Sequence, residues 1–195
     1  MFLRCAYRAV TTDAQLWATL LFGRSGPRAL RLSRLRGRRL AQSMSGELLC
    51  RELLSEAEPE ESFILEEDER NKPYLPGSRL YVSISHSGGY VAAAVADAPV
   101  GIDLQELRKI SDAVLRRYYS HDERSWINAG EPTERAVRLW TMKEAYGKLL
   151  GIGIFSGIRF SAGFADGRII TEYDDVSFHF PDAPEGQCLT VCLAK

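Results

Sequence analysis

The chain has 195 residues, and 45% of them are apolar, which is enough to bury one large domain or two small ones. A formal net charge of -1 gives no overall bias toward nucleic acid or an anionic membrane surface. No stretch approaches the roughly 20 apolar residues of a membrane span, and the N-terminal apolar run is too short for a signal peptide. A cytoplasmic protein is therefore expected.

Charge is nevertheless distributed unevenly along the sequence. Seven arginines lie between Arg24 and Arg39, and nine carboxylates lie between Glu52 and Glu69. The arginine block is compatible with a site for a polyanionic ligand and equally with a solvated helix face.

Helical periodicity marks the first part of the chain, at residues 11–22 and 29–55. The segment from Asn71 to Gly77 is expected to be irregular, because Pro73 disfavours helical backbone at Lys72 and a second proline interrupts any strand ladder. Three strands are expected next, at residues 80–87, 90–96 and 100–105, with a Gly88-Gly89 turn between the first two.

The second part begins with two helical patterns, at residues 111–128 and 134–150. Ser111 and Thr133 are the expected N-caps, and Gly151 is expected to end the second helix. Strands are then expected at residues 158–164, 168–172, 176–180 and 188–193, with a hairpin turn at Asp166-Gly167. Helices precede strands twice in this order, which predicts an α+β chain of two similar halves.

Two segments carry acidic side chains that could hold a metal. In the strand at 100–105, Val100, Ile102 and Leu104 face the core, so that Asp103 and Gln105 face the opposite way together. Taken alone, Asp103 is better explained as a turn residue than as a metal ligand. With a helix-borne carboxylate it would supply the oxygen ligands that Mg²⁺ prefers.

Such a carboxylate lies in the run from Trp140 to Lys148, where Glu144 and Lys148 are four residues apart on one helix face. This pair is either an ordinary surface ion pair or a place where a metal and a phosphate lie side by side. The expected buried stripe of this helix lies well round from both residues and consists of Leu139, Met142, Tyr146 and Leu149.

The segment from Ser83 to Gly89 offers hydrogen-bond donors at a strand end. Ser85, His86 and the flexible Gly88-Gly89 backbone could bind a phosphate, and they fit equally a hairpin rich in turn residues. No acid placed for a Ser-His-Asp triad and no nucleophile elbow is evident.

Five motifs together are similar to the Sfp-type 4′-phosphopantetheinyl transferases, over about residues 30–165 and in the order of that family. They are Lys72-Pro73, Ser83-Ile84-Ser85-His86-Ser87, Val100-Gly101-Ile102-Asp103, Arg117-Tyr118-Tyr119-Ser120 with Glu123, and Trp140-Thr141-Met142-Lys143-Glu144-Ala145 with Lys148.

The resemblance implies Mg²⁺-dependent transfer of phosphopantetheine from coenzyme A (CoA) to a serine of an apo acyl or peptidyl carrier protein, releasing adenosine 3′,5′-bisphosphate. It implies a pseudo-dimer of two α+β halves with the active site in the cleft between them. CoA-binding elements would lie in residues 1–99, and the metal site and carrier-binding elements in residues 100–195. A monomer is expected, without nucleic acid or membrane as a partner.

The resemblance also implies a role for each matching residue. Asp103 and Glu144 would hold Mg²⁺, Glu144 would take the proton of the carrier serine, and Lys148 would stabilise the leaving phosphate. The further CoA contacts would be Lys72, Ser85, His86 and one arginine of the Arg31–Arg39 block, taken here as Arg39.

One departure concerns the metal site, because many members of the family carry a second acid two residues after the aspartate and this chain has Gln105. A glutamine carbonyl can still contact Mg²⁺ or a bound water, but one negative charge is lost. In the family the segment corresponding to 110–130 helps to receive the carrier protein, and in this chain it is expected to expose Tyr118, Tyr119 and Trp126 among charged residues. An amphipathic helix packed on the core fits this segment equally well.

Two hypotheses from other classes stay open. One is a non-catalytic protein of the same fold that binds CoA or a carrier protein. The other is an RNA-binding module that uses the arginine block, although that block lacks interleaved aromatic residues.

Overall fold

The computed structural model describes residues 2–13, 27–152 and 160–195. Contacts divide the chain into two compact units, Met1–Val100 and Gly101–Lys195. Each unit combines helices with antiparallel strand pairs, which confirms the predicted α+β class. Of the helices that the structure describes, none is long and apolar enough to cross a membrane.

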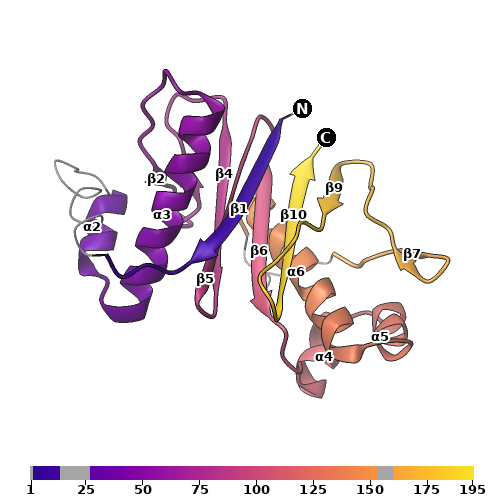
Figure 1. The fold of residues 1–195 in the computed structure, drawn as a ribbon. Helices are drawn as coiled ribbons and strands as arrows, with labels where there is room; N and C mark the ends of the chain where they lie inside the picture. Colours follow the sequence, from indigo (N-terminus) through magenta and orange to yellow (C-terminus); the bar gives the residue numbers. More distant parts are fainter. Residues whose placement is uncertain (1, 14–26, 153–159) are drawn as a thin grey trace. The chain divides into compact units, whose positions relative to one another are not determined.

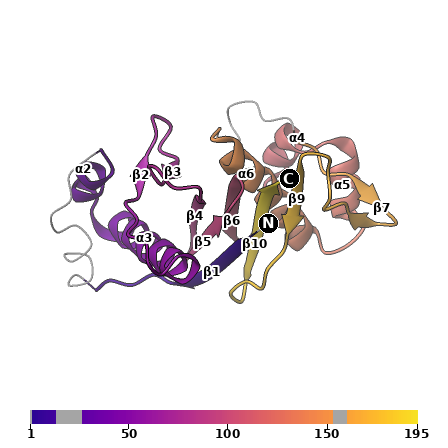
Figure 2. The ribbon, with the colours of Figure 1, turned by 90° about the horizontal axis from the view of Figure 1, so that it is seen from above.

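The first unit is a three-stranded sheet with a long helix on it. Its elements are β1 (Leu3–Ala9), α2 (Pro27–Arg34), α3 (Gly37–Ala57), β2 (Glu66–Glu67), β3 (Pro73–Tyr74), β4 (Tyr81–Ser87) and β5 (Tyr90–Ala96). The strand order is β1-β5-β4 with both pairs antiparallel, and α3 lies against one face of this sheet (Figures 1 and 2). Leu49 and Leu53 of α3 pack there with Val82, Val91 and Val95 of the strands.

The second unit is built on helix α6. Its elements are β6 (Val100–Glu106), α4 (Asp112–Tyr118), α5 (His121–Asn128), α6 (Pro132–Leu150), β7 (Phe164–Ala165), β8 (Arg168–Ile169), β9 (Val176–His179) and β10 (Gln187–Ala194). The sheet order is β6-β10-β9, and α6 packs on β10. Leu139, Met142 and Leu149 of α6 form a buried core with Phe178 and Cys192.

The backbones of β6 and α6 approach each other closely at Gly101. A Cβ atom added to Gly101 would lie 1.9 Å from the carbonyl oxygen of Ala145 and 2.6 Å from the amide nitrogen of Leu149. Only a residue without a side chain fits between the strand and the helix backbone at this point. Helix α6 ends shortly afterwards at Gly151, which has the left-handed conformation (φ 68°), as the sequence predicted.

Several predicted elements differ in the structure. The helix predicted at 29–55 is interrupted around Arg36 and becomes α2 and α3, and strand β1 was not predicted at all. The order of the first unit is therefore strand, helices and strands, and not helices followed by strands. The helix predicted at 11–22 lies outside the described residues except for 11–13, which are not helical.

Local hydrogen bonding explains further differences. The predicted helix at 111–128 breaks at Tyr119 and Ser120, because the Ser120 side chain caps α5 in a capping box with Glu123. Helix α6 begins at Pro132 and not after Thr133, since proline is well suited to the first helical position.

Several strands also have other boundaries in the structure than the sequence predicted. The Asn71–Gly77 segment contains the two-residue strand β3, which pairs with β2. The strand predicted at 168–172 is reduced to β8, with an isolated bridge at Glu172. The Asp166-Gly167 hairpin turn is confirmed between β7 and β8. Of the strand predicted at 158–164, residues 158 and 159 lie outside the described part, and only Phe164 is extended in a ladder.

Gly101→Ala is expected to lower the free energy of unfolding by about 1–3 kcal/mol, the usual range for overpacking a close-packed interior. The added methyl group would meet backbone atoms of α6, which cannot rotate away as a side chain can. Urea unfolding followed by circular dichroism measures this change. Gly89→Ala is the matched control, because a Cβ at Gly89 meets nothing within 4 Å. Equal stability of the two variants would contradict the close-approach argument.

Candidate functional site

Strand β6 and helix α6 bring Asp103, Gln105 and Lys148 into direct contact. Lys148 Nζ donates a hydrogen bond to Asp103 Oδ1 at 2.7 Å and another to the carbonyl oxygen of Ile102 at 2.9 Å. Gln105 Nε2 donates to Asp103 Oδ2 at 3.2 Å. Asp103 is buried and Lys148 is half-buried, so the ammonium group of Lys148 compensates a carboxylate that is largely removed from water.

Glu144 lies one helical turn before Lys148 and is influenced electrostatically by both residues of the ion pair. Its pKa is raised to about 7, first by burial and second by the negative charge of Asp103, against the lowering influence of Lys148. Two carboxylates that repel each other beside one lysine form a place where additional positive charge is favoured.

The side chains fit a magnesium ion of the kind that keeps several waters. Mg²⁺ is commonly held by one or two carboxylates, with water and substrate phosphate oxygens completing an octahedron. Asp103 and Glu144 provide two carboxylates, and Gln105 lies beside the first of them. Within residues 2–13, 27–152 and 160–195, no group of three or more His, Cys, Asp or Glu side chains could hold a metal, so a dedicated all-protein cage is not found there.

A cavity of about 550 Å³ lies beside this cluster, entirely within the second unit. Glu144 and Gln105 line it together with the cationic residues Arg108 and Lys109. The rest of its lining is mostly apolar and includes Ile110, Val114, Tyr118, Val137 and Trp140. Glu106 also lines the cavity, so that two carboxylates and two cations lie at its polar end. The cavity can therefore hold a ligand that has both a charged end and an uncharged arm.

Sequence reasoning assigned no role to Lys143, and it left Glu123 as one residue of a motif. Glu123 is fully buried and accepts hydrogen bonds from Lys143 Nζ at 2.7 Å and from the backbone N–H groups of Ser120 and Ala162 at 2.7 and 2.9 Å. Lys143 also donates to the carbonyl oxygen of Phe160 at 2.6 Å. Burial lowers the pKa of Lys143, and its hydrogen bond to Glu123 opposes this effect.

The buried pair of Lys143 and Glu123 attaches one turn of α6 to α5 and to residues 160–162. Glu144 belongs to this turn of α6. The capping-box spacing from Ser120 to Glu123 was the signal in the sequence that could have placed Glu123 at a helix start. No local pattern indicated its partnership with Lys143, which lies 20 residues away.

Tyr118, Tyr119 and Trp126 were expected to be exposed among charges, and this expectation is wrong for Tyr119. Tyr119 is buried, and its hydroxyl donates to the carbonyl oxygen of Ala136 at 2.9 Å. Trp126 is half-buried and donates from Nε1 to the carbonyl oxygen of Gly167 at 2.8 Å. Tyr119 therefore belongs to the core and not to a surface that could receive a partner.

The remaining predicted site residues lie in the first unit. Ser85 is buried and His86 is exposed on β4, where they pair with Ala92 and Val91 of β5. Lys72 is half-buried in the loop between β2 and β3, and burial lowers its pKa, whereas the negative charge of Asp68 raises it.

Arg39 is exposed near the start of α3. It is the preceding residue, Arg38, whose Nη2 donates at 2.6 Å to the carbonyl oxygen of Gly88, in the turn that follows His86. Arg38 was not singled out in the sequence.

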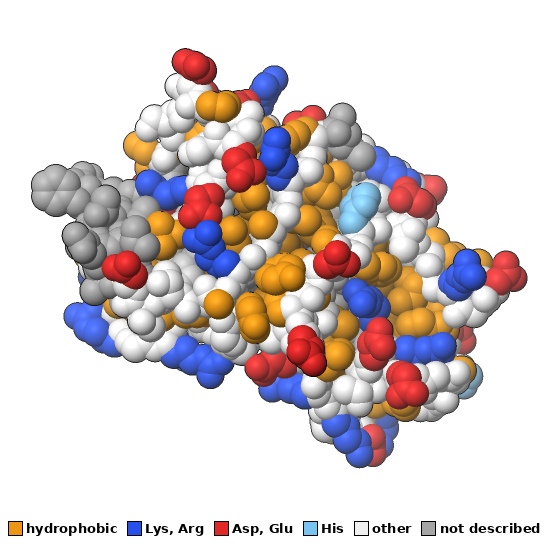
Figure 3. Space-filling view, in the orientation of Figure 1, with side chains coloured by type: hydrophobic (Ala, Val, Ile, Leu, Met, Phe, Trp, Pro, Cys, Tyr) orange, Lys and Arg blue, Asp and Glu red, His pale blue; other side chains and the backbone are white. Residues whose placement is uncertain are grey.

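Part of the arginine block is occupied by internal ion pairs. Arg28 and Arg31 both contact the carboxylate of Glu67, and Arg28 also contacts Glu47. The face shown in Figure 3 has basic and acidic side chains interspersed over most of its area. The sequence suggested that the arginine block is a site for a polyanion or a solvated helix face. Arg28 fits neither interpretation, because it is buried.

Comparison with known proteins gives consistent matches. Residues 99–192 match the family model of the 4′-phosphopantetheinyl transferase superfamily. The chain is 39% identical over 124 residues to the 4′-phosphopantetheinyl transferase psf-1 of Bacillus pumilus, an alignment that covers 60% of this chain and 53% of that protein. It is 32% identical over 138 residues to the 4′-phosphopantetheinyl transferase Sfp of Bacillus subtilis (strain 168), covering 65% of this chain and 61% of that protein.

A third relative, the 4′-phosphopantetheinyl transferase gsp of Aneurinibacillus migulanus, is 29% identical over 119 residues, which are 58% of this chain and 50% of that protein. The chain thus spans about half the length of the first relatives that it matches. A solved structure, the holo-[acyl-carrier-protein] synthase of Thermotoga maritima, is 17% identical, with a TM-score of 0.40 over 50% of this chain and 63% of that one, and is too distant to support a structural argument. The resemblance that the five motifs indicated is confirmed by the family and sequence matches, which relate the chain to the Sfp-type 4′-phosphopantetheinyl transferases.

Proposed function

We propose that this chain transfers the 4′-phosphopantetheine group of CoA to a serine hydroxyl of an apo acyl or peptidyl carrier protein, with Mg²⁺ as cofactor. The observation that carries the proposal is the contact of Lys148 with Asp103, beside a glutamate whose pKa is about 7. The sequence relationship to 4′-phosphopantetheinyl transferases supports the same reaction.

In the proposed reaction the serine Oγ attacks the phosphorus that carries the pantetheine arm. The bond from this phosphorus to the bridging pyrophosphate oxygen breaks, so that the holo carrier and adenosine 3′,5′-bisphosphate are formed. Glu144 takes the serine proton, and a carboxyl with a pKa of about 7 is well matched to that task near neutral pH.

Lys148 binds the leaving phosphate, and Asp103 orients the Lys148 ammonium group through their 2.7 Å hydrogen bond. Asp103 and Glu144, with Gln105 beside them, would hold Mg²⁺, which when bound neutralises charge on the pyrophosphate. Lys72, Ser85, His86 and Arg39 are proposed as further CoA contacts, so that residues 1–99 supply CoA-binding elements and residues 100–195 supply the metal and carrier elements.

The direct test incubates the protein with CoA, Mg²⁺ and a panel of apo carrier domains and detects phosphopantetheine on the carrier by mass spectrometry. Glu144→Ala is expected to reduce the transfer rate by at least about 100-fold, the lower range for loss of a general base. Glu134→Ala, an exposed change on the same helix, should keep activity. CoA binding in calorimetry without transfer to any carrier would instead favour the non-catalytic binding protein.

The raised pKa of Glu144 predicts a pH-dependent effect on stability that needs no substrate. A carboxyl with a folded-state pKa of about 7 against a usual value of 4.5 stabilises the fold at low pH and loses that contribution as the pH rises to 7. Glu144→Gln removes the cost of ionisation. It is expected to raise the thermal unfolding midpoint at about pH 8 and to change it little at about pH 5, in buffer with a chelator.

Glu60→Gln serves as the control, because Glu60 is exposed and its neutralisation should have the same small effect at both pH values. A Glu144→Gln effect that is equal at both pH values would show that Glu144 ionises normally in the folded protein.

Gln105→Glu is expected to lower the Mg²⁺ concentration needed for half-maximal transfer, because it places a third negative charge beside Asp103. Without metal the same variant should be less stable than the parent, since the amide that now donates to Asp103 would become a repelling carboxylate. Titration with Mg²⁺ in transfer and thermal-unfolding assays measures both effects. An unchanged or higher Mg²⁺ requirement would show that residue 105 does not face the metal.

A further inference from the structure

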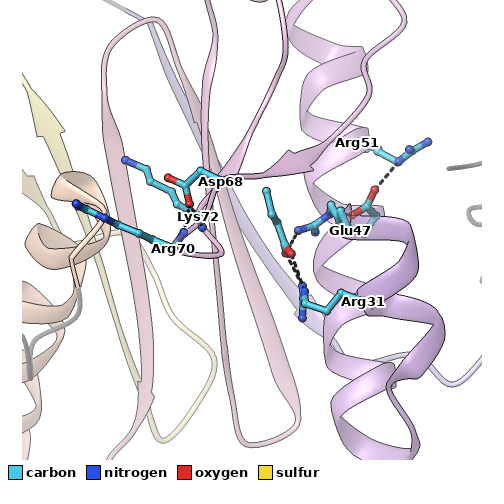
Figure 4. A network of polar contacts seen from close by, with 8 residues as sticks. Arg31, Glu47, Arg51, Asp68, Arg70 and Lys72 are labelled. Carbon is cyan, nitrogen blue, oxygen red and sulfur yellow. Dashed lines mark hydrogen bonds and ion pairs between the residues drawn. The ribbon is translucent and has the colours of Figure 1, made fainter. Parts of the chain in front are cut away.

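Five charged side chains from three elements of the first unit form one ion-pair network (Figure 4). Arg28 of α2 donates from Nε to Glu47 of α3 at 2.7 Å and from Nη1 to Glu67 of β2. Arg31 of α2 donates to Glu67 through Nε at 2.6 Å and also through Nη2. Arg51 of α3 donates to Glu47 at 3.2 Å.

The network is buried where it joins the elements. Side-chain exposure is 5% for Arg28, 0% for Glu47 and 6% for Glu67, whereas it is 38% for Arg31. Charges this far from water are tolerated only with well-formed partners, and apolar residues in the same place often give equal or greater stability. Stability alone is therefore a weak reason for this arrangement, and the planar arginine groups suit a role that requires defined geometry.

Glu67 connects the network to the loop that carries Lys72. Strands β2 and β3 contain only two residues each, so their ladder alone gives the hairpin little rigidity. Asp68 follows Glu67 directly, and its Oδ1 accepts hydrogen bonds from the backbone N–H groups of Arg70 at 2.9 Å and Lys72 at 2.8 Å. Asn71 completes the loop in the left-handed conformation, with φ 61°.

The loop directs two cationic side chains the same way. Figure 4 shows the side chains of Arg70 and Lys72 extending from the loop in the direction away from helix α3. Helix α3 is the element that carries Glu47 and Arg51. Two cations on one side of a tightly hydrogen-bonded loop are suited to an anionic group such as a phosphate.

We propose that the network of Arg28, Arg31, Glu47 and Glu67 is a positioning device that holds loop 68–72 so that Lys72, with Arg70 beside it, meets a phosphate of CoA. Glu67 connects the network to the loop. Two arginines of α2 bind its carboxylate, and the loop begins at the next residue, Asp68. The inference rests on the proposed function, since it takes CoA as the ligand of Lys72. Ordering the loop before binding removes an entropic cost that the ligand would otherwise have to offset.

The test is a double-mutant cycle on CoA affinity, measured by calorimetry on the full chain. Lys72→Ala is expected to raise the Kd about 10-fold. Arg31→Ala, which loosens the loop while Glu67 keeps its contact with Arg28, is expected to raise it about 5-fold. The double variant should bind no more than about 2-fold more weakly than Lys72→Ala alone, because Arg31 acts through Lys72. Arg31→Lys, which keeps one charged donor, should recover part of the affinity.

Arg79→Ala is the matched control, since it removes an exposed arginine–glutamate pair of the same unit, that of Arg79 with Glu58 at 3.0 Å. Its Kd for CoA should equal that of the parent, and thermal unfolding confirms that each variant folds.

Three outcomes overturn the inference. Effects of Arg31→Ala and Lys72→Ala that multiply in the double variant would show that Arg31 binds CoA itself or acts through the whole fold. An unchanged Kd in Arg31→Ala would overturn the positioning role while leaving the proposed role of Lys72 intact. An unchanged Kd in Lys72→Ala would overturn both, and the transfer assay with Glu144→Ala would still test the catalytic proposal separately.

Discussion

The second unit depends on the contact between two backbones at Gly101. Because this residue has no Cβ, the carbonyl of Ala145 and the amide of Leu149 lie where a side chain would be. Asp103 follows two residues later on the same strand. At Gly101 this strand contacts the turn of α6 that runs from Ala145 to Leu149. Lys148 belongs to that same turn and reaches Asp103 at 2.7 Å. The motif residue Gly101 is thus a steric requirement for the acidic site.

The two lysines of α6 differ in burial and in their partners. Lys143 is buried, bonded to Glu123 and to the carbonyl oxygen of Phe160, and so holds the helix in place. Lys148 is half-buried, lies one helical turn after the cavity-lining Glu144, and is paired with Asp103. Lys143 thereby holds the helix turn that carries its neighbour Glu144. Lys148 partly offsets the effects of burial and of Asp103, which together raise the pKa of Glu144.

Sequence periodicity predicted the elements whose apolar residues alternate or repeat regularly, such as β4, β5 and α6. It could not predict that the helix at 111–128 breaks at Ser120, because the break depends on a side chain capping the backbone and not on hydrophobic spacing. That break also explains why Tyr119 is in the core although the surrounding sequence is charged. The sequence placed Asp103 and Gln105 on one strand face but gave no contact between Asp103 and Lys148, since that contact depends on how strand and helix pack.

Long-range ion pairs were the least predictable part of the molecule. The arginine block and the acidic block were separate patterns in the sequence, and their union through Arg28 and Glu67 joins residues 39 positions apart. Local patterns carry no information about such pairs, because many arginine and glutamate combinations are sterically equivalent before the chain folds.

Gln105 has a physical consequence for the protein before any metal binds. Asp103 and Glu144 already repel each other, and burial adds to the cost of ionising Glu144. A third carboxylate beside Asp103 would add to this repulsion, whereas the Gln105 amide donates a hydrogen bond to Asp103 and adds no negative charge. The glutamine therefore leaves Asp103 with a hydrogen-bond donor in place of a repelling charge, in addition to the ammonium group of Lys148.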